Sequence, residues 1–355
     1  MTRLTALMPG IMLDTSPQSI ASAGKSDIMN ASAPPRLNAP DAGGPTPIWL
    51  QPSDETAIAH ALRRLGWLAD DATLTGVSRA GDGNLNIVLR VESGSRTAIL
   101  KQARPWVEKY PEISAPVGRS LVEVAYYRLV HAVPELSALS PALLGSDPTW
   151  YTLLLEDLGD AGDATSLYAG DTLSAADLDR LMTYLVALHG LSDRATRMPD
   201  NAAMLALNHH YIFEQPFSPD GDDADLAGIA AALGKRYLSG AGVPLHGDYF
   251  PGAWVKSNRG LYIIDPEFCL IGPPEFDLGV MAAHLLMAGG PASTTQTLAA
   301  QYGESGGGVL DTALLARFTG VEIWRRLRGV AQLPLSLDDV ARDALLDIAR
   351  MMLRA

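Results

Sequence analysis

The chain of 355 residues is long enough for one large domain or two lobes, and its 47% hydrophobic residues are ample for a buried core. Its formal net charge of −13 argues against general nucleic-acid binding, which depends on basic surface. The single cysteine, Cys269, excludes an internal disulfide framework and a metal site built from several cysteines. No apolar run reaches the roughly 18–20 residues needed to span a bilayer, so we expect a cytoplasmic protein without membrane or nucleic-acid partners.

The first segment, residues 1–47, is rich in Ala, Ser, Pro and Gly and shows no sustained period of 2 or 3.6. Such a segment buries too little apolar surface to offset its ordering entropy, so we expect a disordered leader. Order is expected to begin at Ser53, as the N-cap of a helix that carries acidic residues in its first turn and runs to Trp67.

The next stretch is rich in β-branched residues and predicts a small antiparallel β lobe with one helix. Its expected elements are strands at 74–79, 85–91 and 97–101, a helix at 117–133 and a strand at 150–155. The remainder is largely helical, with helices expected at 174–190, 225–238, 275–289, 293–303, 310–331 and 337–354. This pattern predicts an α+β fold of two lobes, 48–158 with the hinge and 159–355, with a ligand site between them.

A glycine-containing turn precedes a lysine and a helical glutamate. Gly81, Gly83 and Asn84 lie between two expected strands, where they could bring backbone N–H groups to a phosphate or form an ordinary hairpin turn. Lys101 ends the next strand, and Glu123 lies on the following helix. Alone, they would be a solvated lysine and a surface charge. In this order they match a lysine that grips ATP phosphates and pairs with a helix glutamate.

A further strand exit falls at the expected boundary between the lobes. Glu156 and Leu158 follow the apolar run 153–155, where a connecting segment can offer backbone groups to the edge of an adenine ring. An ordinary turn from strand to loop would explain the same pattern.

Three carboxylates in the second half suit phosphoryl transfer, in which one acid orients the attacking hydroxyl and others hold magnesium. Asp248 lies in a loop after His246, which we expect to bond the loop backbone. Asp265 and Glu267 follow an apolar strand, and period-2 geometry would turn both toward one Mg²⁺ ion. We therefore expect all three acids to meet around one cation. Asp277, at the start of an apolar helix, is expected to be a cap or loop anchor.

Two adjacent arginines follow Trp324 in the expected helix at 310–331. Because neighbouring helical residues point in different directions, Arg325 and Arg326 should not both face the core. They would then lie on a solvated face. Alternatively, one or both reach the cleft, where the fork geometry of a guanidinium suits a polyol or a transferring phosphate.

Together these residues resemble the aminoglycoside-phosphotransferase-like kinases, which share the two-lobed protein-kinase-like fold. Within that group the chain resembles the S-methyl-5-thioribose kinases most, which phosphorylate the 1-hydroxyl of their sugar in methionine salvage. The likeness lies in GDGNLNIVLRV at 81–91, LKQARPWV at 100–107, LLLEDLGD at 153–160, HGDYFPG and IDPEFCLIGPPEFDLG within 246–279, and WRRLRGVA at 324–331.

The resemblance implies a transferase that uses ATP and Mg²⁺ to phosphorylate a small polyol. In it Asp248 would be the catalytic base, Asp265 and Glu267 would bind Mg²⁺, and Lys101 would hold the ATP phosphates. Homodimers are frequent in the family, so a homodimer is expected.

The resemblance also assigns the remaining binding residues. The segment around Glu156 and Leu158 would hold adenine. Arg325 and Arg326 would contact the sugar, and Trp324 would shape the pocket beside them.

Two other interpretations remain open, and a departure from the wider group bears on the first of them. The group has a metal-binding Asn five residues after the catalytic Asp, whereas this chain has Ala253. A nucleotide-binding pseudokinase module would fit that change. A kinase of another acceptor, such as an aminoglycoside, an amino alcohol or a different sugar, is the second alternative. The acidic run at 219–225 could meet a cationic acceptor, or it could be a solvated loop.

Overall fold

The computed structural model describes residues 46–81, 85–191, 200–220, 223–333 and 335–355. All of them belong to one compact unit, Arg36–Ala355. The leader expected at 1–47 lies almost wholly outside the described residues and stays a prediction.

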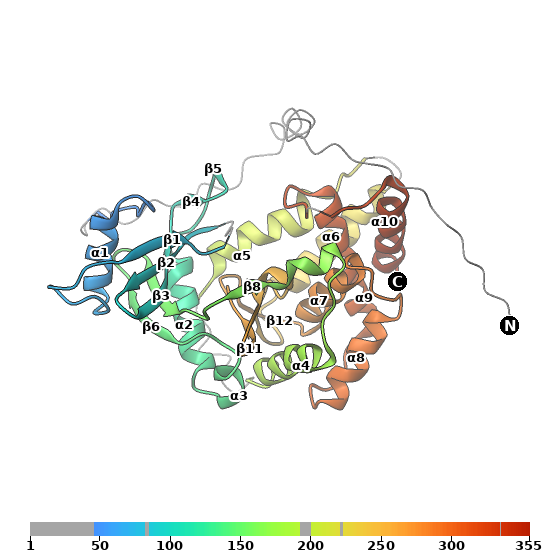
Figure 1. Ribbon diagram of the computed structural model, residues 1–355. Coiled ribbons are helices and arrows are strands. Elements are labelled where there is room, and N and C mark those ends of the chain that lie inside the picture. Colours follow the sequence, from blue (N-terminus) through green and yellow to red (C-terminus); the bar gives the residue numbers. More distant parts are fainter. Residues whose placement is uncertain (1–45, 82–84, 192–199, 221–222, 334) are drawn as a thin grey trace, which may run out of the picture. The chain divides into compact units, whose positions relative to one another are not determined.

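The N-terminal part is built on a five-stranded sheet in which every neighbouring pair is antiparallel, as expected (Figure 1). The strand order is β1-β2-β3-β7-β6. The strands are β1 (Gly76–Arg79), β2 (Asn86–Ser93), β3 (Arg96–Ala103), β7 (Thr152–Glu156) and β6 (Leu143–Asp147), with a separate hairpin of β4 (Trp106–Val107) and β5 (Tyr110–Ser114). The sequence predicted four of these seven strands. The strand β6 and the hairpin were missed.

Two helices cover opposite faces of this sheet. One face packs on α1 (Glu55–Arg64), and the other packs on α2 (Arg119–Val130). The cap of α1 is Asp54, whose side chain accepts from the N–H of Ala57, and not Ser53 as expected. An aspartate at this position satisfies a free helix N–H and also complements the helix dipole.

The alternation of β3 decides where its lysine points. Leu100 is buried in the core beneath α1, so the next side chain, Lys101, faces α2 on the other side of the sheet. On β2 the same alternation turns Ile87 toward α1 and Asn86 toward the opposite face. One face of the sheet thus supplies core, and the other supplies polar groups to the site.

The C-terminal part is mainly helical, and the six helices predicted there are all present with bounds within three residues of those expected. The sequence missed a short helix with its π-helical extension and several short strands. The helices after residue 158 are η2 (Ala164–Ala169), α4 (Ala175–His189), α5 (Ala202–His209), η4 (His210–Glu214), α6 (Ala224–Tyr237), η5 (Pro251–Ala253), α7 (Glu275–Met287), α8 (Thr294–Glu304), α9 (Thr312–Arg328) and α10 (Asp339–Leu353), and the short α3 (Pro134–Ser137) follows α2 before that boundary.

Short strands bring the two acidic loops of this half together. The pair β9 (Val243–Leu245) and β12 (Leu270–Gly272) is antiparallel, and so is the sheet of β11 (Gly260–Ile263), β10 (Trp254–Ser257) and β8 (Ala161–Asp163). The loop after β9 carries Asp248, and the loop between β11 and β12 carries Asp265. Pairing of β9 with β12 therefore places both loops at one end of the strands.

The hydrophobic cores cross the expected lobe boundary. One core joins side chains of α2 and β7 to those of α4 and β11, so apolar packing continues across residue 158. A second core lies among α6, α7, α9 and α10. The division at 158 stays a prediction. Among the described residues, no helix has the length and apolar character needed to cross a membrane.

Candidate active site

The loop that carries Asp248 is fixed by its backbone. Gly247 has φ +85°, and a Cβ there would meet the carbonyl oxygen of Phe268 at 2.1 Å, so only glycine fits. The N–H groups of His246 and Gly247 donate to the carboxylate of Asp277 at 2.7 and 2.9 Å. Asp277 is fully buried on α7 and acts as the expected loop anchor.

Asp277 contacts a buried histidine, which in turn contacts a buried tyrosine. The Nε2 of His189 lies 3.4 Å from Asp277, and the Nδ1 of His189 lies 2.9 Å from the hydroxyl of Tyr302. Within the loop, the Nε2–H of His246 donates to the carbonyl of Ile264 at 3.0 Å. Burial lowers the pKa of His246 and keeps the imidazole neutral. His246 therefore bonds the loop backbone, as expected.

Asp248 lies at the mouth of this loop with its side chain 23% exposed. Its Oδ1 is 3.6 Å from the Nη2 atoms of both Arg325 and Arg326. Burial raises the pKa of Asp248 above its ordinary value, although the two arginines oppose the shift. The carboxylate is thus more basic than an exposed aspartate and is flanked by two fixed cations.

Both arginines face inward, so the expectation that neighbours on a helix could not do so is wrong. Arg325 and Arg326 are each 7% exposed, and each donates its Nε–H to the carboxylate of Glu322, one turn earlier on α9. Side chains of this length bend around the helix, so i+3 and i+4 residues can share one partner. Burial alone would raise the pKa of Glu322, but the two arginines hold it well below its usual range.

On the opposite side of the site, one lysine serves a cluster of carboxylates. The Nζ of Lys101 is 2.8 Å from Glu123 and 2.7 Å from Asp265, so the expected pair with the helix glutamate is present. Burial alone would lower the pKa of Lys101, but Asp265, Glu123 and Glu267 raise it above its ordinary value. Because one ammonium cannot compensate all of them, burial raises the pKa of Glu123 to about 7 despite the lysine.

The chain leaves the strand conformation at Asp265, so the period-2 argument does not apply to Asp265 and Glu267. Asp265 has a left-handed backbone, with φ +62°, and the chain turns there. Its side chain is 43% exposed and contacts Lys101. The Oε2 of Glu267 accepts from the Nδ2 of Asn86 at 2.8 Å and lies 3.7 Å from the Nε of Arg119.

The three acids therefore do not gather around one point as expected. In the parts of the chain that the structure describes, no group of three or more acids, histidines or cysteines is placed to hold a metal ion. The charge of Asp265 nevertheless acts on both Asp248 and Glu267 and contributes to the raised pKa of each. Mg²⁺ is usually held by one or two carboxylates and by substrate phosphates, so three protein ligands are not required.

The sequence missed two polar residues that join the glycine turn to Glu267. Arg119, the first residue of α2, donates to the Oδ1 of Asn86 at 2.8 Å. Asn86 is the last residue of the GDGNLN motif, so its place in that motif was the available signal. Gly81 is exposed with φ +75°, whereas Gly83 and Asn84 lie outside the described residues.

The connection between the lobes is fixed by its own side chains. The carboxylate of Glu156 accepts from Arg259 at 2.7 Å and from the N–H of Ala142 at 3.1 Å. Leu158 is buried. These contacts leave an adenine role to the backbone of the segment, and that role stays a prediction.

Trp324 packs in the helical core on α9. Its Nε1–H donates to the carbonyl of Pro216 at 2.9 Å, and its ring stacks on Phe217. Its expected role beside the pocket stays a prediction. In the acidic run at 219–225, whose residues 221–222 are outside the description, Asp223 pairs with Arg350 of α10.

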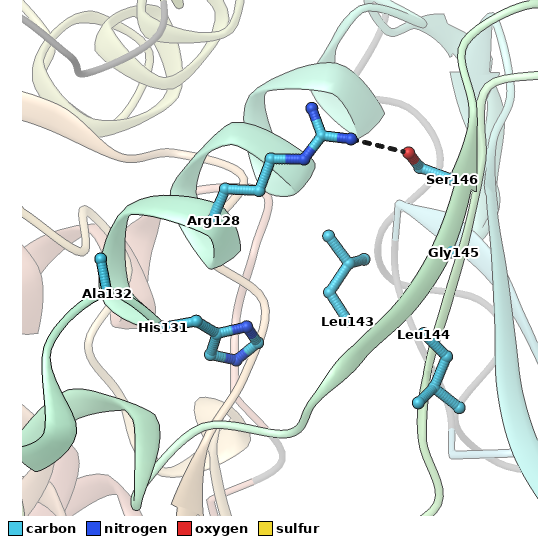
Figure 2. Close-up of a pocket in the computed structure, with 7 residues that line it drawn as sticks. All are labelled: Arg128, His131, Ala132, Leu143, Leu144, Gly145 and Ser146. Atoms are coloured by element: carbon cyan, nitrogen blue, oxygen red, sulfur yellow. Dashed lines mark hydrogen bonds between the residues drawn. The ribbon is translucent and has the colours of Figure 1, made fainter.

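A surface hollow lies elsewhere on the N-terminal part, between α2 and β6 (Figure 2). Its volume is about 490 Å³, and the Nη2 of Arg128 lies 3.4 Å from the Oγ of Ser146 within it. None of the acids described above lines it. Its lining residues are Arg128, His131, Ala132, Leu143, Leu144, Gly145 and Ser146.

The sequence is similar to curated methylthioribose kinases. It is 27% identical over 255 residues to that of Escherichia coli O45:K1, covering 60% of this chain and 57% of the relative. It is 28% identical over 271 residues to that of Pectobacterium atrosepticum, covering 66% of this chain and 65% of the relative. The matches thus span less than two thirds of each relative's length.

Solved structures establish the fold. The choline kinase LicA from Streptococcus pneumoniae is 16% identical, with a TM-score of 0.53, and the match covers 84% of this chain and 98% of that one. A choline kinase from Cryptosporidium parvum is 13% identical, also with a TM-score of 0.53, and the match covers 84% of this chain and 93% of that one. The fold is the two-lobed protein-kinase-like fold. The profile of the phosphotransferase enzyme family (APH) matches residues 76–316, and the chain therefore belongs to that family.

Proposed function

We propose that this protein is an ATP-dependent kinase that phosphorylates a hydroxyl of a small neutral polyol, with the 1-hydroxyl of S-methyl-5-thioribose as the first candidate. One observation carries the proposal. Asp248, a carboxylate made more basic by burial, faces two buried arginines, and the charge of Asp265 in the Lys101 cluster also acts on it. This arrangement supports a general base, a site for the substrate hydroxyl and a phosphate site close to one another.

In the proposed reaction, Asp248 accepts the proton of the substrate hydroxyl as its oxygen attacks the γ-phosphorus of ATP. The new O–P bond forms while the bond from that phosphorus to the β–γ bridging oxygen breaks, and ADP leaves with the bridging oxygen. The raised pKa of Asp248 suits this role, because a general base works best when its pKa approaches the working pH. Lys101 holds phosphate oxygens in place.

The charge of the phosphate side fits a divalent cation. Lys101 and Arg119 there face three carboxylates, those of Glu123, Asp265 and Glu267, so negative charge is in excess. Asp265, with its half-exposed carboxylate, and Glu267 are the residues that would hold Mg²⁺. When bound, the ion would neutralise charge on the phosphates.

The acceptor side favours a neutral hydroxylated substrate over a cationic one. Two guanidinium groups flank Asp248, and a choline or aminoglycoside amine placed there would meet like charge. The fork of each guanidinium can donate to sugar hydroxyls. The acidic run at 219–225, an alternative attraction for amines, is partly engaged, since Asp223 pairs with Arg350 and Asp225 with Arg354. The names of the curated relatives support methylthioribose among neutral sugars.

One feature favours a second candidate, a nucleotide-binding module without turnover. Ala253 is buried, and its N–H and carbonyl are both used by the backbone, so its position offers no metal ligand. ATP binding without any phosphoryl transfer to a panel of acceptors would identify that module.

The test is an assay of ADP release by the full-length chain with ATP, Mg²⁺ and each of methylthioribose, ribose, choline and an aminoglycoside. We expect turnover with methylthioribose, little with ribose and none with the amines. We also expect methylthioribose with an ATP analogue and Mg²⁺ to raise the melting temperature, since a ligand that binds the native state stabilises it. Preferred turnover of choline or the aminoglycoside would contradict the neutral-polyol proposal. The homodimer and the cytoplasmic location stay predictions.

A further inference from the structure

A network of four hydrogen bonds lies behind the arginine pair, and three of them are buried. The hydroxyl of Tyr168, on η2, is 2.6 Å from the Nδ1 of His284, on α7. The Nε2 of His284 is 2.9 Å from Glu322 on α9. Glu322 in turn accepts from the Nε–H groups of Arg325 and Arg326. Three elements that are distant in the sequence thus meet at one carboxylate.

The protonation states of the side chains in this hydrogen-bond network follow from their partners. The carboxylate of Glu322 can only accept, so the Nε2 of His284 donates and its Nδ1 accepts from the Tyr168 hydroxyl. Burial lowers the pKa of His284 to about 4, even though Glu322 opposes the shift. His284 is therefore neutral at physiological pH, and its donor–acceptor direction is fixed.

The packing around His284 leaves little room for rearrangement. His284 and Glu322 are almost fully buried. The ring of Phe250 packs 5.3 Å from His284 and also lies 4.9 Å beneath the guanidinium of Arg326. Phe250 follows Asp248 by two residues in the same loop. The histidine thus supports the carboxylate that both arginines share, and the loop of Asp248 packs over it.

Glu322 explains how two adjacent helical residues act on one point. Consecutive side chains leave a helix in different directions, and only a shared partner one turn earlier draws both forks together. Because Glu322 takes the Nε–H of each arginine, the Nη2 groups of Arg325 and Arg326 remain directed toward Asp248. We propose that Glu322, supported by His284 and Tyr168, is a positioning residue that holds the two arginine forks side by side at the acceptor site.

This proposal rests on the proposed function for its kinetic consequence, and its structural part can be measured without turnover. In Glu322→Gln the carbonyl can accept from one arginine only, and the new NH₂ faces the N–H of the other. We expect the KM for the acceptor to rise about tenfold or more while the KM for ATP stays within about twofold of the wild-type value. Glu214→Gln, at an exposed glutamate that also pairs with histidines, is the matched control.

Three further variants separate positioning from folding. His284→Gln keeps an N–H donor for Glu322, whereas His284→Phe keeps the ring shape and removes both nitrogens. We expect the Gln variant to retain near-wild-type acceptor KM and the Phe variant to raise it. Tyr168→Phe removes only the hydroxyl and should give a smaller rise. If Glu322→Gln does not fold, this set decides, and equal acceptor KM in His284→Phe and the wild type overturns the proposal.

A second measurement distinguishes failure of the positioning proposal from failure of the proposed function. Hydrogen-bonded Nε–H groups of Arg325 and Arg326 should give two arginine NMR signals protected from solvent exchange, and Glu322→Gln should lose at least one. A wild-type protein without protected signals overturns the positioning proposal whatever its activity. A wild type that phosphorylates no acceptor but shows both signals refutes the proposed function and retains the positioning. Unchanged acceptor KM in folded Glu322→Gln also overturns the positioning role.

Discussion

Around Lys101 one ammonium is shared by two carboxylates with a third nearby, whereas around Asp248 two guanidinium groups face two carboxylates. The first cluster has surplus negative charge even after Arg119 is included, and it can accept a cation. The second is balanced by its own residues. The phosphate side therefore depends on charge brought by its ligands, and the acceptor side is organised before any ligand arrives.

The two clusters should also respond to pH in opposite directions. The pKa of Glu123 is raised to about 7, so the folded state binds a proton more readily than the unfolded chain, and acidification from pH 7 stabilises the fold through this group. The pKa of His284 is lowered to about 4, so the unfolded chain binds the proton more readily, and acidification destabilises the fold. On acidification, the buried glutamate and the buried neutral histidine therefore change the free energy of unfolding in opposite directions.

The largest effect is expected from Asp248→Asn, which removes the proton acceptor and changes the shape of the side chain little. General-base catalysis contributes about 10²–10⁴-fold, so kcat should fall by about that factor. ATP affinity, which the proposed function assigns to the Lys101 cluster, should remain. Steady-state kinetics and binding of a fluorescent ATP analogue measure both. Equal turnover in the variant would remove Asp248 from the mechanism.

Lys101→Met would test the phosphate side alone. The buried carboxylate of Glu123 would lose its cation, and breaking a buried pair costs about 3–5 kcal/mol of stability. We expect a lower melting temperature, a higher KM for ATP and an acceptor KM close to that of the wild type. Thermal unfolding with and without Mg²⁺ follows the stability. A rise in acceptor KM equal to that for ATP would show that the two sides are not separate.

Arg325→Lys and Arg326→Lys test the acceptor side. A lysine is a point charge and cannot bind Glu322 and a substrate hydroxyl together in the fork geometry. Each variant should raise the acceptor KM about tenfold, with unchanged KM for ATP. Arg328→Lys, on the exposed side of the same helix, is the control. Unchanged kinetics in both variants would show that the two arginines have a purely structural role.

The smallest effect at neutral pH concerns stability, because it develops only on acidification. In the wild type, His284 makes the free energy of unfolding fall as pH drops from 6.5 toward 4, by at most about 1.4 kcal/mol per pH unit. His284→Gln should flatten this slope. Urea unfolding at several pH values measures it, with His60→Gln, an exposed position on α1, as control. An unchanged slope would show that His284 does not cause the pH dependence.

Hydrophobic periodicity was enough to locate the main helices and the central strands, and the motifs around Lys101, Asp248 and Asp265 were enough to identify the family. Local rules failed where the chain departs from regular geometry. The left-handed backbone of Asp265 cannot be read from an Asp-Pro pair, so the strand geometry assumed for Asp265 and Glu267 was wrong.

Long side chains and distant pairs were the other limit. Arg325 and Arg326 bend toward the carboxylate of Glu322, one turn away on the helix. A helical wheel gives only the direction in which each side chain leaves the backbone, so it cannot predict where the end of a long side chain lies. The pairing of Asn86 with Glu267 joins residues 181 positions apart. No periodic pattern carries such information.

The single cysteine of the chain has a practical consequence. Cys269 is fully buried, and burial raises the pKa of its thiol, so it remains protonated and unreactive toward alkylating reagents in the folded state. New cysteines placed on exposed positions of α1 and α8 could therefore carry fluorophores without removal of the native one. A donor–acceptor pair at those positions would report directly whether nucleotide binding brings the sheet closer to the helices.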